Sequence, residues 1–497
     1  MIGTLRRRRR PIAPPWRRPS PVPGGPLWVD LGATQPHPID LRWVDEMMES
    51  ARPHLRVRPA DELLILVPNS PVKVNPTALR ILGAMVDEGL GIAEVLAREG
   101  DGPRRRREIH AFFTDLTAWL NGTLGEGRGR RAVVHEPFTA DFCRYPVLSE
   151  IALTYRCNLS CGFCYAGCGV GALPEGWSEG RTMSDDEVCR VLEIIQHDAR
   201  CPSVSFTGGE PTLRPGLPRL VRHAKALGLK VNLISNGQHL DEGRTGDLAE
   251  AGLDSAQLSL EGPTAEIHDA QVQRPGAFER LWDAVERLRA RGVRVHTNTT
   301  VTRRTLAHAA AVVDLVADRG LPRLTMNLVI PCGTAGADPE VSVSYSEIGD
   351  HVPGLRDRAE ARGVELVWYS PLPLCLFNTV AHGLGNRGCA AADGLLHVSP
   401  AGDVLPCSSF SHGESLGNLL HEPFEAIWQS RAARFFRSKE MMPPGCRGCI
   451  EAPVCQGACV LYWREVGLAE LGGPSGARPP LPPGFGHGDG SGPRALG

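Results

Sequence analysis

Three cysteines, Cys157, Cys161 and Cys164, stand close together between Leu153 and Tyr165. Thiolates at such spacings bind iron–sulfur clusters or zinc. Because three thiolates bind only three irons of a four-iron cluster, one iron is left for another ligand, which suits chemistry at the cluster. With 15 cysteines among 497 residues, a given three-cysteine spacing arises by chance only about 0.01 times. The alternatives are a zinc knuckle or buried free cysteines.

A second concentration of cysteines lies toward the C-terminal end. One run has the form Cys-x2-Cys-x5-Cys-x3-Cys, and an upstream pair has the form Cys-x12-Gly-x4-Cys, with a hairpin turn expected at residues 401–403. The cysteines concerned are Cys389, Cys407, Cys446, Cys449, Cys455 and Cys459. These spacings predict further iron–sulfur sites, and a zinc site over residues 446–459 is the alternative.

The composition excludes several classes of function. A length of 497 residues suits two or three domains, and 42% hydrophobic content supplies real cores. The net charge of −2 gives no global field that favours nucleic acid or a membrane surface. No apolar run approaches the ~20 residues that span a bilayer, and Arg6–Arg10 precede no signal-peptide core. The cysteines are therefore expected in a reducing compartment, the cytoplasm, where clustered thiols indicate metal binding instead of disulfides.

The middle of the chain alternates between strand and helix patterns, with a capping box at residues 184–187. Six parallel strands with crossing helices predict an α/β fold that forms an incomplete, (β/α)6-type barrel, whose chemistry lies at the strand C-termini. Strands are expected at 149–155, 203–207, 230–234, 255–260, 293–301 and 324–330, and helices at 184–197, 217–226, 278–290 and 306–318.

Polar or glycine-rich motifs follow several of these strands. The segment Thr207-Gly-Gly-Glu-Pro211 follows the second strand, and the others are 235–237, 258–262 and 274–276. Paired glycines let backbone groups approach a ligand closely, although turn and capping chemistry explains each motif equally well when it is taken singly.

Together with the three-cysteine motif, these strand ends resemble those of radical S-adenosylmethionine (SAM) enzymes. The resemblance implies that the open iron chelates SAM, and that SAM is cleaved reductively to a 5′-deoxyadenosyl radical, which abstracts hydrogen from a C–H bond. A closed, mostly apolar barrel interior is expected, because water and other hydrogen donors must be excluded. No general base or other catalytic side chain is identified. By resemblance, the residues that contact SAM are Tyr165, Gly208, Gly209, Glu210, Asn236, Ser259 and Arg274.

The N-terminal part predicts a small α+β unit of three strands followed by three helices. Strands are expected at 55–57, 63–67 and 72–74, and helices at 77–87, 91–98 and 108–120, with a loop at Arg104–Arg107. This pattern resembles the PqqD-like family, which implies recognition of a precursor peptide's leader as an added strand near 72–74. A winged-helix DNA-binding domain is the alternative, but ten basic and nine acidic side chains over 52–115 offer little attraction for phosphates.

The C-terminal cysteines resemble the SPASM domain of peptide-modifying radical SAM enzymes. The resemblance implies a first auxiliary four-iron cluster on Cys375, Cys389, Cys407 and Cys459, and a second on Cys446, Cys449 and Cys455. Because no cysteine follows Cys459, the second cluster lacks its usual last ligand. The substitutes considered are Tyr462, Glu465, His487 and Asp489, or an iron left open; a single auxiliary cluster is the other possibility.

These resemblances predict a cytoplasmic radical SAM maturase that closes a thioether or C–C crosslink in a ribosomally made peptide. It would need a reductant such as flavodoxin or ferredoxin, and neither nucleic acid nor membrane. The alternatives are radical SAM chemistry on a small molecule, such as a tetrapyrrole, and a non-catalytic iron–sulfur or zinc protein that binds peptide. The expected parts are a disordered segment at 1–45, a PqqD-like domain at 50–125, a linker at 126–147, the barrel at 148–345, the SPASM domain at 360–465 and a disordered tail at 470–497.

Overall fold

The chain folds as two compact units, Met1–Glu136 and Pro137–Gly497. The computed structural model describes residues 39–121, 133–134 and 143–485, apart from 175–176, 337, 339, 386–387, 412 and 475. None of the helices in this described part of the chain is both long and apolar enough to cross a bilayer.

The first unit is an antiparallel sheet, in the order β1-β2-β3-β4, with helices packed around one apolar core. Asn75 begins the second helix by accepting a hydrogen bond from the Ala78 N–H, and Pro76 occupies its first turn. The elements are α1 (Arg42–Ala51), β1 (Leu55–Arg58), β2 (Leu63–Leu66), β3 (Ser70–Val74), α2 (Pro76–Val86), α3 (Ile92–Glu99), α4 (Pro103–Leu120) and β4 (Val133–Val134).

The predicted three strands and three helices are present in this unit, but three details differ. The helix α1 begins inside the segment expected to be disordered, because Val44 and Met48 are fully buried in the core. Arg104–Arg107 are helical rather than a loop: Pro103 opens α4, and Arg104 pairs with Glu108 one turn later. The short strand β4, which falls in the expected linker, pairs with Lys73 and Val74 of β3.

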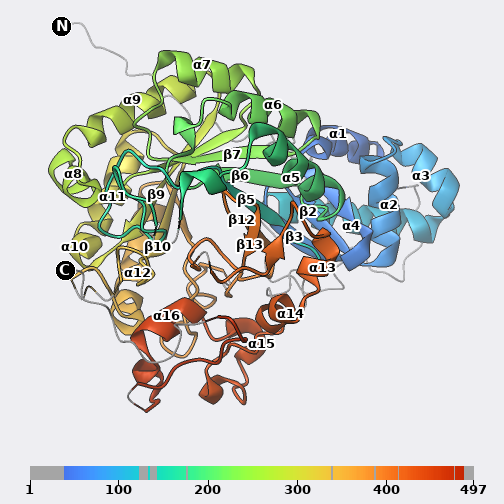
Figure 1. Ribbon diagram of the computed structural model, residues 1–497. Coiled ribbons are helices and arrows are strands. Elements are labelled where there is room, and N and C mark those ends of the chain that lie inside the picture. The colour runs from blue at the N-terminus through green and yellow to red at the C-terminus, as the bar shows by residue number, and fades with distance from the viewer. Residues whose placement is uncertain are drawn as a thin grey trace, which may run out of the picture. The chain divides into compact units, whose positions relative to one another are not determined.

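The second unit contains the predicted parallel sheet, with six strands in sequential order from β5 to β10 and helices between them (Figure 1). Ser184 caps the first of these helices through the expected capping box with Glu187. The elements are β5 (Leu148–Ala152), α5 (Asp185–His197), β6 (Ser203–Thr207), α6 (Leu217–Ala226), β7 (Lys230–Ser235), α7 (Glu242–Glu250), β8 (Ser255–Ser259), α8 (Ala265–Val272), α9 (Ala277–Ala290), β9 (Arg294–Val301), α10 (Arg303–Leu306), α11 (Ala309–Asp318) and β10 (Arg323–Leu328).

The sheet continues beyond these six strands at both ends, in the order β11-β10-β9-β8-β7-β6-β5-β12-β13-β14. The hairpin predicted at 401–403 joins β12 to β13, with Gly402 in the left-handed region at φ +88°. The added elements are α12 (Tyr345–Ala361), β11 (Glu365–Trp368), β12 (Leu395–Val398), β13 (Asp403–Leu405), β14 (Gly417–Asn418), α13 (Phe424–Trp428), α14 (Arg431–Arg437), α15 (Ala452–Cys455) and α16 (Val460–Val466). Short 3-10 turns lie at Arg52–His54, Pro59–Asp61, Glu179–Arg181, Pro211–Leu213, Pro444–Cys446 and Ala469–Leu471.

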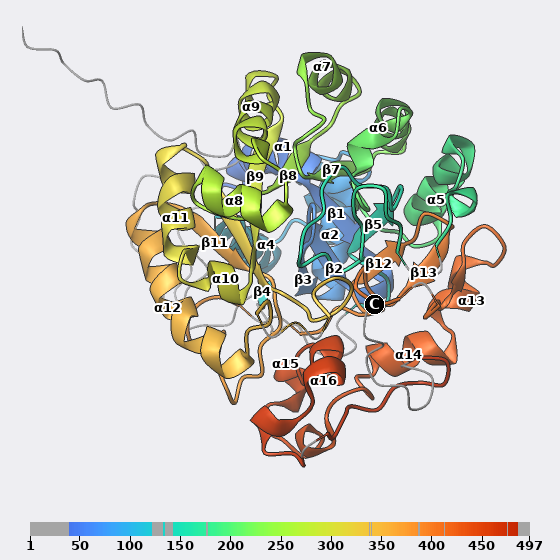
Figure 2. The same ribbon diagram turned by 60° about the vertical axis from the view of Figure 1, so that its left-hand side comes forward.

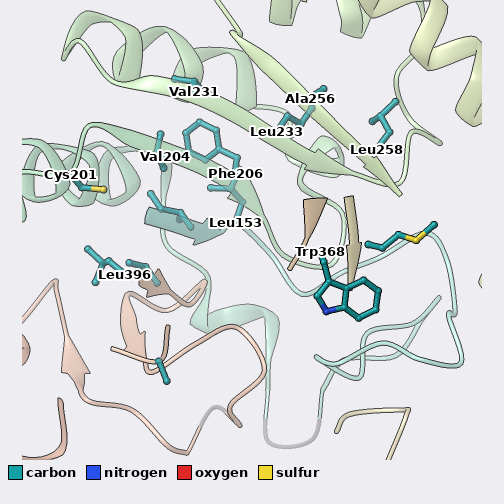
Figure 3. Close-up of a cluster of buried hydrophobic side chains, with 14 of the residues drawn as sticks. Leu153, Cys201, Val204, Phe206, Val231, Leu233, Ala256, Leu258, Trp368 and Leu396 are labelled. Atoms are coloured by element: carbon teal, nitrogen blue, oxygen red, sulfur yellow. The ribbon is translucent and has the colours of Figure 1, made fainter. Parts of the chain in front are cut away.

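The sheet is curved, and the helices lie along its outer face (Figure 2). Alternate apolar residues of the strands pack there against the helices. Figure 3 shows part of this core, with Val204 and Phe206 of β6 beside Val231 and Leu233 of β7. Because successive side chains of a strand point to opposite faces, the residues between them face the inside of the curve.

The segment expected to be a disordered tail is ordered as far as the structure describes it. Phe485 packs edge-on against Phe410 and Phe436, and Leu481 also packs against the core. The expected His487 and Asp489 lie outside the described residues. Two apolar side chains in a Pro/Gly-rich segment are therefore enough to attach it to the core.

Candidate functional site

The three cysteines of the first motif lie in a loop that follows β5, at the C-terminal edge of the sheet. The loop after β10 holds this loop in place: the Cys164 N–H donates to Thr334 Oγ1 over 2.8 Å, and the Thr334 N–H donates to the Cys164 carbonyl over 2.9 Å. Gly333 has φ +60°, and a Cβ there would lie 2.2 Å from the Cys164 carbonyl oxygen. Only glycine permits this approach of the two loops.

Two of the expected SAM-contacting residues bind the cysteine loop itself. Asn236 Nδ2 donates to Asn158 Oδ1 over 2.8 Å and lies 3.8 Å from Cys157 Sγ. Arg274 Nη1 donates to the Asn158 carbonyl over 2.8 Å. The strand ends after β7 and β8 therefore converge on the first cysteine, as expected for residues at the carboxyl edge of a parallel sheet.

Backbone N–H groups point at the sulfur atoms of this loop. A hydrogen bond from the Cys168 thiol and the N–H groups of Cys168, Ala166 and Gly167 lower the pKa of Cys164 to about 7. Burial raises the pKa of Cys157 to about 12, although the N–H groups of two following residues oppose it. N–H donors aimed at sulfur are what a cluster-bound thiolate requires, so this loop fits an iron–sulfur cluster. Cys168 is thereby placed as a hydrogen-bonding neighbour of Cys164.

The glycines after β6 are needed for contact with the cysteine loop. A Cβ on Gly208 would lie 2.2 Å from the Thr154 carbonyl oxygen, and one on Gly209 would lie 2.3 Å from that of Arg156. The Gly209 N–H donates to the Thr154 carbonyl over 2.7 Å. The pair therefore permits close approach of the protein's own backbone, and the approach of these glycines to a ligand stays a prediction.

Glu210 is fully buried and organises two strand ends. Its Oε1 accepts from Ser235 Oγ over 2.8 Å and from the Thr212 N–H over 3.0 Å, and its Oε2 accepts from the Asn236 N–H over 2.8 Å. Burial raises its pKa, and these hydrogen bonds oppose that rise. Both carboxylate oxygens of Glu210 are thus hydrogen-bonded within the protein. Because Oε2 accepts from the Asn236 N–H, Glu210 positions Asn236.

The remaining two expected SAM-contacting residues lie at the same edge of the sheet. Ser259 is the last residue of β8 and stands in register with Asn298 of β9. Tyr165 follows Cys164, and its carbonyl oxygen would lie 2.4 Å from a Cβ on Gly333. Burial raises the pKa of the Tyr165 hydroxyl well above its usual value, and the Glu150 carboxylate adds to this. The structure thus brings all seven of these residues to the carboxyl edge around the cysteine loop.

The inner face of the sheet is polar, which contradicts the expectation of a mostly apolar interior. Asn232 bonds to Ser205 over 3.3 Å and accepts from Ser255 over 2.7 Å, across three neighbouring strands. On the same row, His397 Nδ1 lies 3.1 Å from Glu150 Oε2, and the buried His397 Nε2 has no partner among the described residues. Further pairs are His296 with Gln257 and Asn298 with Asn327. The alternation of polar and apolar residues within each strand was visible in the sequence. The sequence did not show which of the two faces of the sheet points into the barrel.

Glu261 is a site residue that the sequence analysis missed. It follows β8, is 3% exposed, and accepts from the Thr300 N–H over 2.8 Å. Burial raises its pKa to about 8. The neighbouring His268 accepts from the Glu261 N–H over 3.0 Å, and burial lowers its pKa to about 4. The signal was the glutamate two residues after Ser259, inside a motif already noted.

The first C-terminal set comprises the buried Cys389 and Cys459 and the partly buried Cys407, which follows β13 by two residues. Lys439, 1% exposed, donates to the Cys389 carbonyl over 2.7 Å and pairs with Asp393. The Cys459 N–H donates to the Tyr345 hydroxyl over 3.3 Å. Burial raises the pKa of Cys407, and the neighbouring Cys389, Cys459 and Cys332 add to the rise. Cys332 thus lies near this set.

The second set is closer to the surface and includes one more cysteine than the resemblance implied. Burial raises the pKa of Cys446 to about 11, and Cys455, Cys375 and Cys449 add to it. The N–H of Leu374, the residue before Cys375, donates to Cys455 Sγ over 3.4 Å. Cys375 therefore lies beside this set, whereas the resemblance implied that it belongs with Cys389.

The substitute ligands considered for the second set are engaged elsewhere or lie outside the described residues. The Tyr462 hydroxyl accepts from the Tyr345 N–H over 3.2 Å and donates to Glu470, beside Cys459. Glu465 pairs with Arg464 over 2.8 Å. If Cys375 serves as the fourth ligand of the second set, neither Tyr462 nor Glu465 is needed as a ligand.

Within the described residues, no three His, Cys, Asp or Glu side chains gather closely enough to hold a single metal ion. A zinc ion requires its ligand atoms within about 2.3 Å of one point.

Comparison with known proteins decides the family. Residues 151–316 match the model of the radical SAM superfamily. The chain is a radical SAM enzyme. Residues 389–450 match the SPASM model, an iron-sulfur cluster-binding domain. These domains imply four-iron clusters and SAM as cofactors, as the sequence predicted, and they rule out the non-catalytic alternative.

Relatives of this radical SAM enzyme carry two kinds of name. An AdoMet-dependent heme synthase of Oleidesulfovibrio alaskensis is 29% identical over 329 residues, covering 61% of this chain and 80% of that protein. A PqqA peptide cyclase of Streptomyces rochei is also 29% identical, over 334 residues, covering 62% and 83%. Sequence identity alone therefore does not separate a small-molecule substrate from a peptide.

Solved structures share the fold. Streptococcus suis SuiB bound to its precursor peptide SuiA has a TM-score of 0.60 at 15% identity, covering 82% of this chain and 94% of that chain. The protein anSMEcpe with bound AdoMet has a TM-score of 0.53 at 20% identity, covering 64% and 87%. The predicted α/β barrel with a C-terminal SPASM domain is confirmed.

Proposed function

We propose that this radical SAM enzyme matures a ribosomally made precursor peptide, closing a thioether or C–C crosslink by oxidation. The observation that carries this proposal is the extent of the likeness to SuiB. It covers 82% of the chain, which is more than residues 137–497 make up, so it extends into the first unit. The partner in that solved structure is a precursor peptide.

The first unit is better suited to a peptide than to nucleic acid. Its arginines are largely paired with its own acids: Arg58 with Asp61, Arg80 with Glu99, and Arg106 with Asp101. Arg104 and Arg105 both pair with Glu108. Phosphate binding requires cationic side chains that are available to release counterions, and these are already neutralised.

Cys157, Cys161 and Cys164 would hold the catalytic cluster, whose open iron would bind SAM. When bound and reduced, the cluster supplies the electron that cleaves SAM. Gly208 and Gly209 would border the amino group of SAM, Ser259 and Asn236 its ribose and carboxylate, and Tyr165 its adenine. Arg274 and Glu210 would hold this site in shape through their contacts with Asn158 and Asn236. A reductant such as flavodoxin or ferredoxin is part of the proposal.

The polar inner wall supports a peptide substrate. Amide and hydroxyl side chains such as Asn232, Ser255 and Gln257 can exchange hydrogen bonds with peptide N–H and carbonyl groups, which an apolar wall would leave unpaired. Such groups would also orient the substrate beside the radical, so that only one C–H bond is within reach.

The leader would bind the sheet of the first unit by strand addition, but the expected edge near 72–74 is already paired with β4. Only two residue pairs join β4 to β3, so displacing β4 costs few hydrogen bonds. Replacing Val133 and Val134 together by proline removes both N–H donors. Leader affinity, measured by fluorescence anisotropy, should rise several-fold, whereas Val133→Ala with Val134→Ala should leave it unchanged. Weaker binding by the proline variant would show that β4 forms part of the leader site.

A small-molecule substrate is the second candidate, because relatives named heme synthase match this chain as well as the peptide cyclases do. The two proposals predict different products. A crosslinked peptide has lost two hydrogens, whereas a tetrapyrrole whose propionate side chain is oxidatively decarboxylated to a vinyl group has lost carbon dioxide and two hydrogens.

The deciding experiment offers the full chain both substrates and uses mass spectrometry. The peptides are those encoded by short reading frames beside this gene, and the small molecule is a propionate-bearing tetrapyrrole. The proposal predicts a peptide product, and predicts that deleting residues 1–136 abolishes it while SAM cleavage without substrate survives. Conversion of the tetrapyrrole, unaffected by the deletion, would contradict it.

A further inference from the structure

The cysteines outside the first motif separate into two neighbourhoods that differ from those of the SPASM resemblance. Cys389, Cys407 and Cys459 form one, and Cys446, Cys449 and Cys455 form the other. Each has three thiols from the C-terminal motifs. One further cysteine, Cys375, approaches the second neighbourhood from elsewhere in the chain.

Cys375 is held beside the second neighbourhood by a tight turn after β11. The N–H groups of Leu376 and Phe377 both donate to the Pro373 carbonyl over 2.9 Å. Phe377 is buried and stacks on His382, which anchors the turn to the core. The preceding residue, Leu374, donates to Cys455 Sγ over 3.4 Å. The turn therefore offers one exposed thiol to Cys455 and its neighbours.

We propose that Cys375 is the fourth thiolate ligand of the cluster on Cys446, Cys449 and Cys455. This cluster then has four cysteines, and the missing cysteine after Cys459 is replaced from upstream. The assignment concerns the SPASM domain alone and does not depend on the substrate.

The test compares iron content and electron paramagnetic resonance spectra of the anaerobically reconstituted full chain and its variants. The unchanged chain should bind about twelve irons. Cys375→Ala and Cys446→Ala should each lose up to about four irons and leave the same residual spectrum. The double variant should lose no more iron than Cys446→Ala alone. The variant that carries both Cys375→Ala and Cys407→Ala should lose about twice as much iron as either single variant.

Cys201→Ala is the matched control, because Cys201 is buried in the barrel core and its thiol bonds to the Ser203 carbonyl. It should retain all the iron. Production of 5′-deoxyadenosine shows that each variant is folded and retains its catalytic cluster.

Two outcomes would overturn the assignment. If Cys375→Ala gave the spectrum of Cys407→Ala, Cys375 would belong to the first cluster, as the SPASM resemblance implies. If Cys375→Ala retained all its iron and the spectrum of the unchanged chain, Cys375 would not be a ligand. A variant that made no 5′-deoxyadenosine would be replaced by the corresponding serine substitution, which retains the side-chain volume, and the comparison repeated.

Discussion

The two cysteine-rich regions of the second unit differ in how they are assembled. Cys157, Cys161 and Cys164 lie within one short loop, so their spacing along the chain determines how closely they approach one another. The C-terminal sets bring together residues from a turn after β11, a hairpin and a helical segment. Local spacing predicts the first kind of site fully, whereas the second kind depends on how the chain folds.

The largest expected effect comes from the local site. Replacing Cys157, Cys161 and Cys164 together by alanine should remove about four irons per chain and reduce 5′-deoxyadenosine production to background. The C-terminal clusters should persist, because no residue of their sets is changed. Iron analysis and chromatography of the nucleoside check this. Unchanged 5′-deoxyadenosine production would contradict the placement of the catalytic cluster.

A second prediction tests whether the loop of the first cysteine motif depends on its contact with the loop after β10. Gly333→Ala places a Cβ 2.2 Å from the Cys164 carbonyl oxygen, so the two loops must separate. SAM cleavage should fall by at least about tenfold, as for other small displacements of reacting groups. Gly363→Ala is the control, because it has a similar φ of +69° and no neighbouring atom within 4 Å. It should cost only about 1 kcal/mol of stability and leave cleavage intact. Equal effects of the two variants would show that the loop contact is unimportant.

The sequence predicted the parallel strands, the capping box and the hairpin, because each depends on a local pattern. It also placed the expected SAM-contacting residues at one edge, since the carboxyl ends of parallel strands meet there. It did not predict that Glu210 would bond entirely within the protein, or that Cys375 would lie beside Cys455. Both depend on contacts between segments far apart in the chain. The polar inner wall was missed because alternation alone does not show which face points inward.

The smallest expected effect concerns the electrostatics of the buried site. Burial raises the pKa of Glu261 to about 8, above the usual value of about 4.3 in an unfolded chain. Between these values the folded state holds a proton that the unfolded state lacks. Stability should therefore fall as pH rises, by at most about 1.4 kcal/mol per pH unit. Glu261→Gln should flatten this dependence between pH 6 and 8 in denaturant titrations. An identical pH dependence of the two proteins would show that Glu261 is ionised in the folded state.

The central claim is that the radical arises at the barrel edge and that the C-terminal clusters are needed only to complete the product. The most direct test measures 5′-deoxyadenosine and modified peptide in the same reaction with Cys407→Ala. Crosslinking is a net two-electron oxidation, so an electron is left on the product radical, and the first auxiliary cluster would accept it. We therefore expect continued 5′-deoxyadenosine formation without modified peptide when that cluster is lost. Modified peptide at the yield of the unchanged enzyme would contradict it.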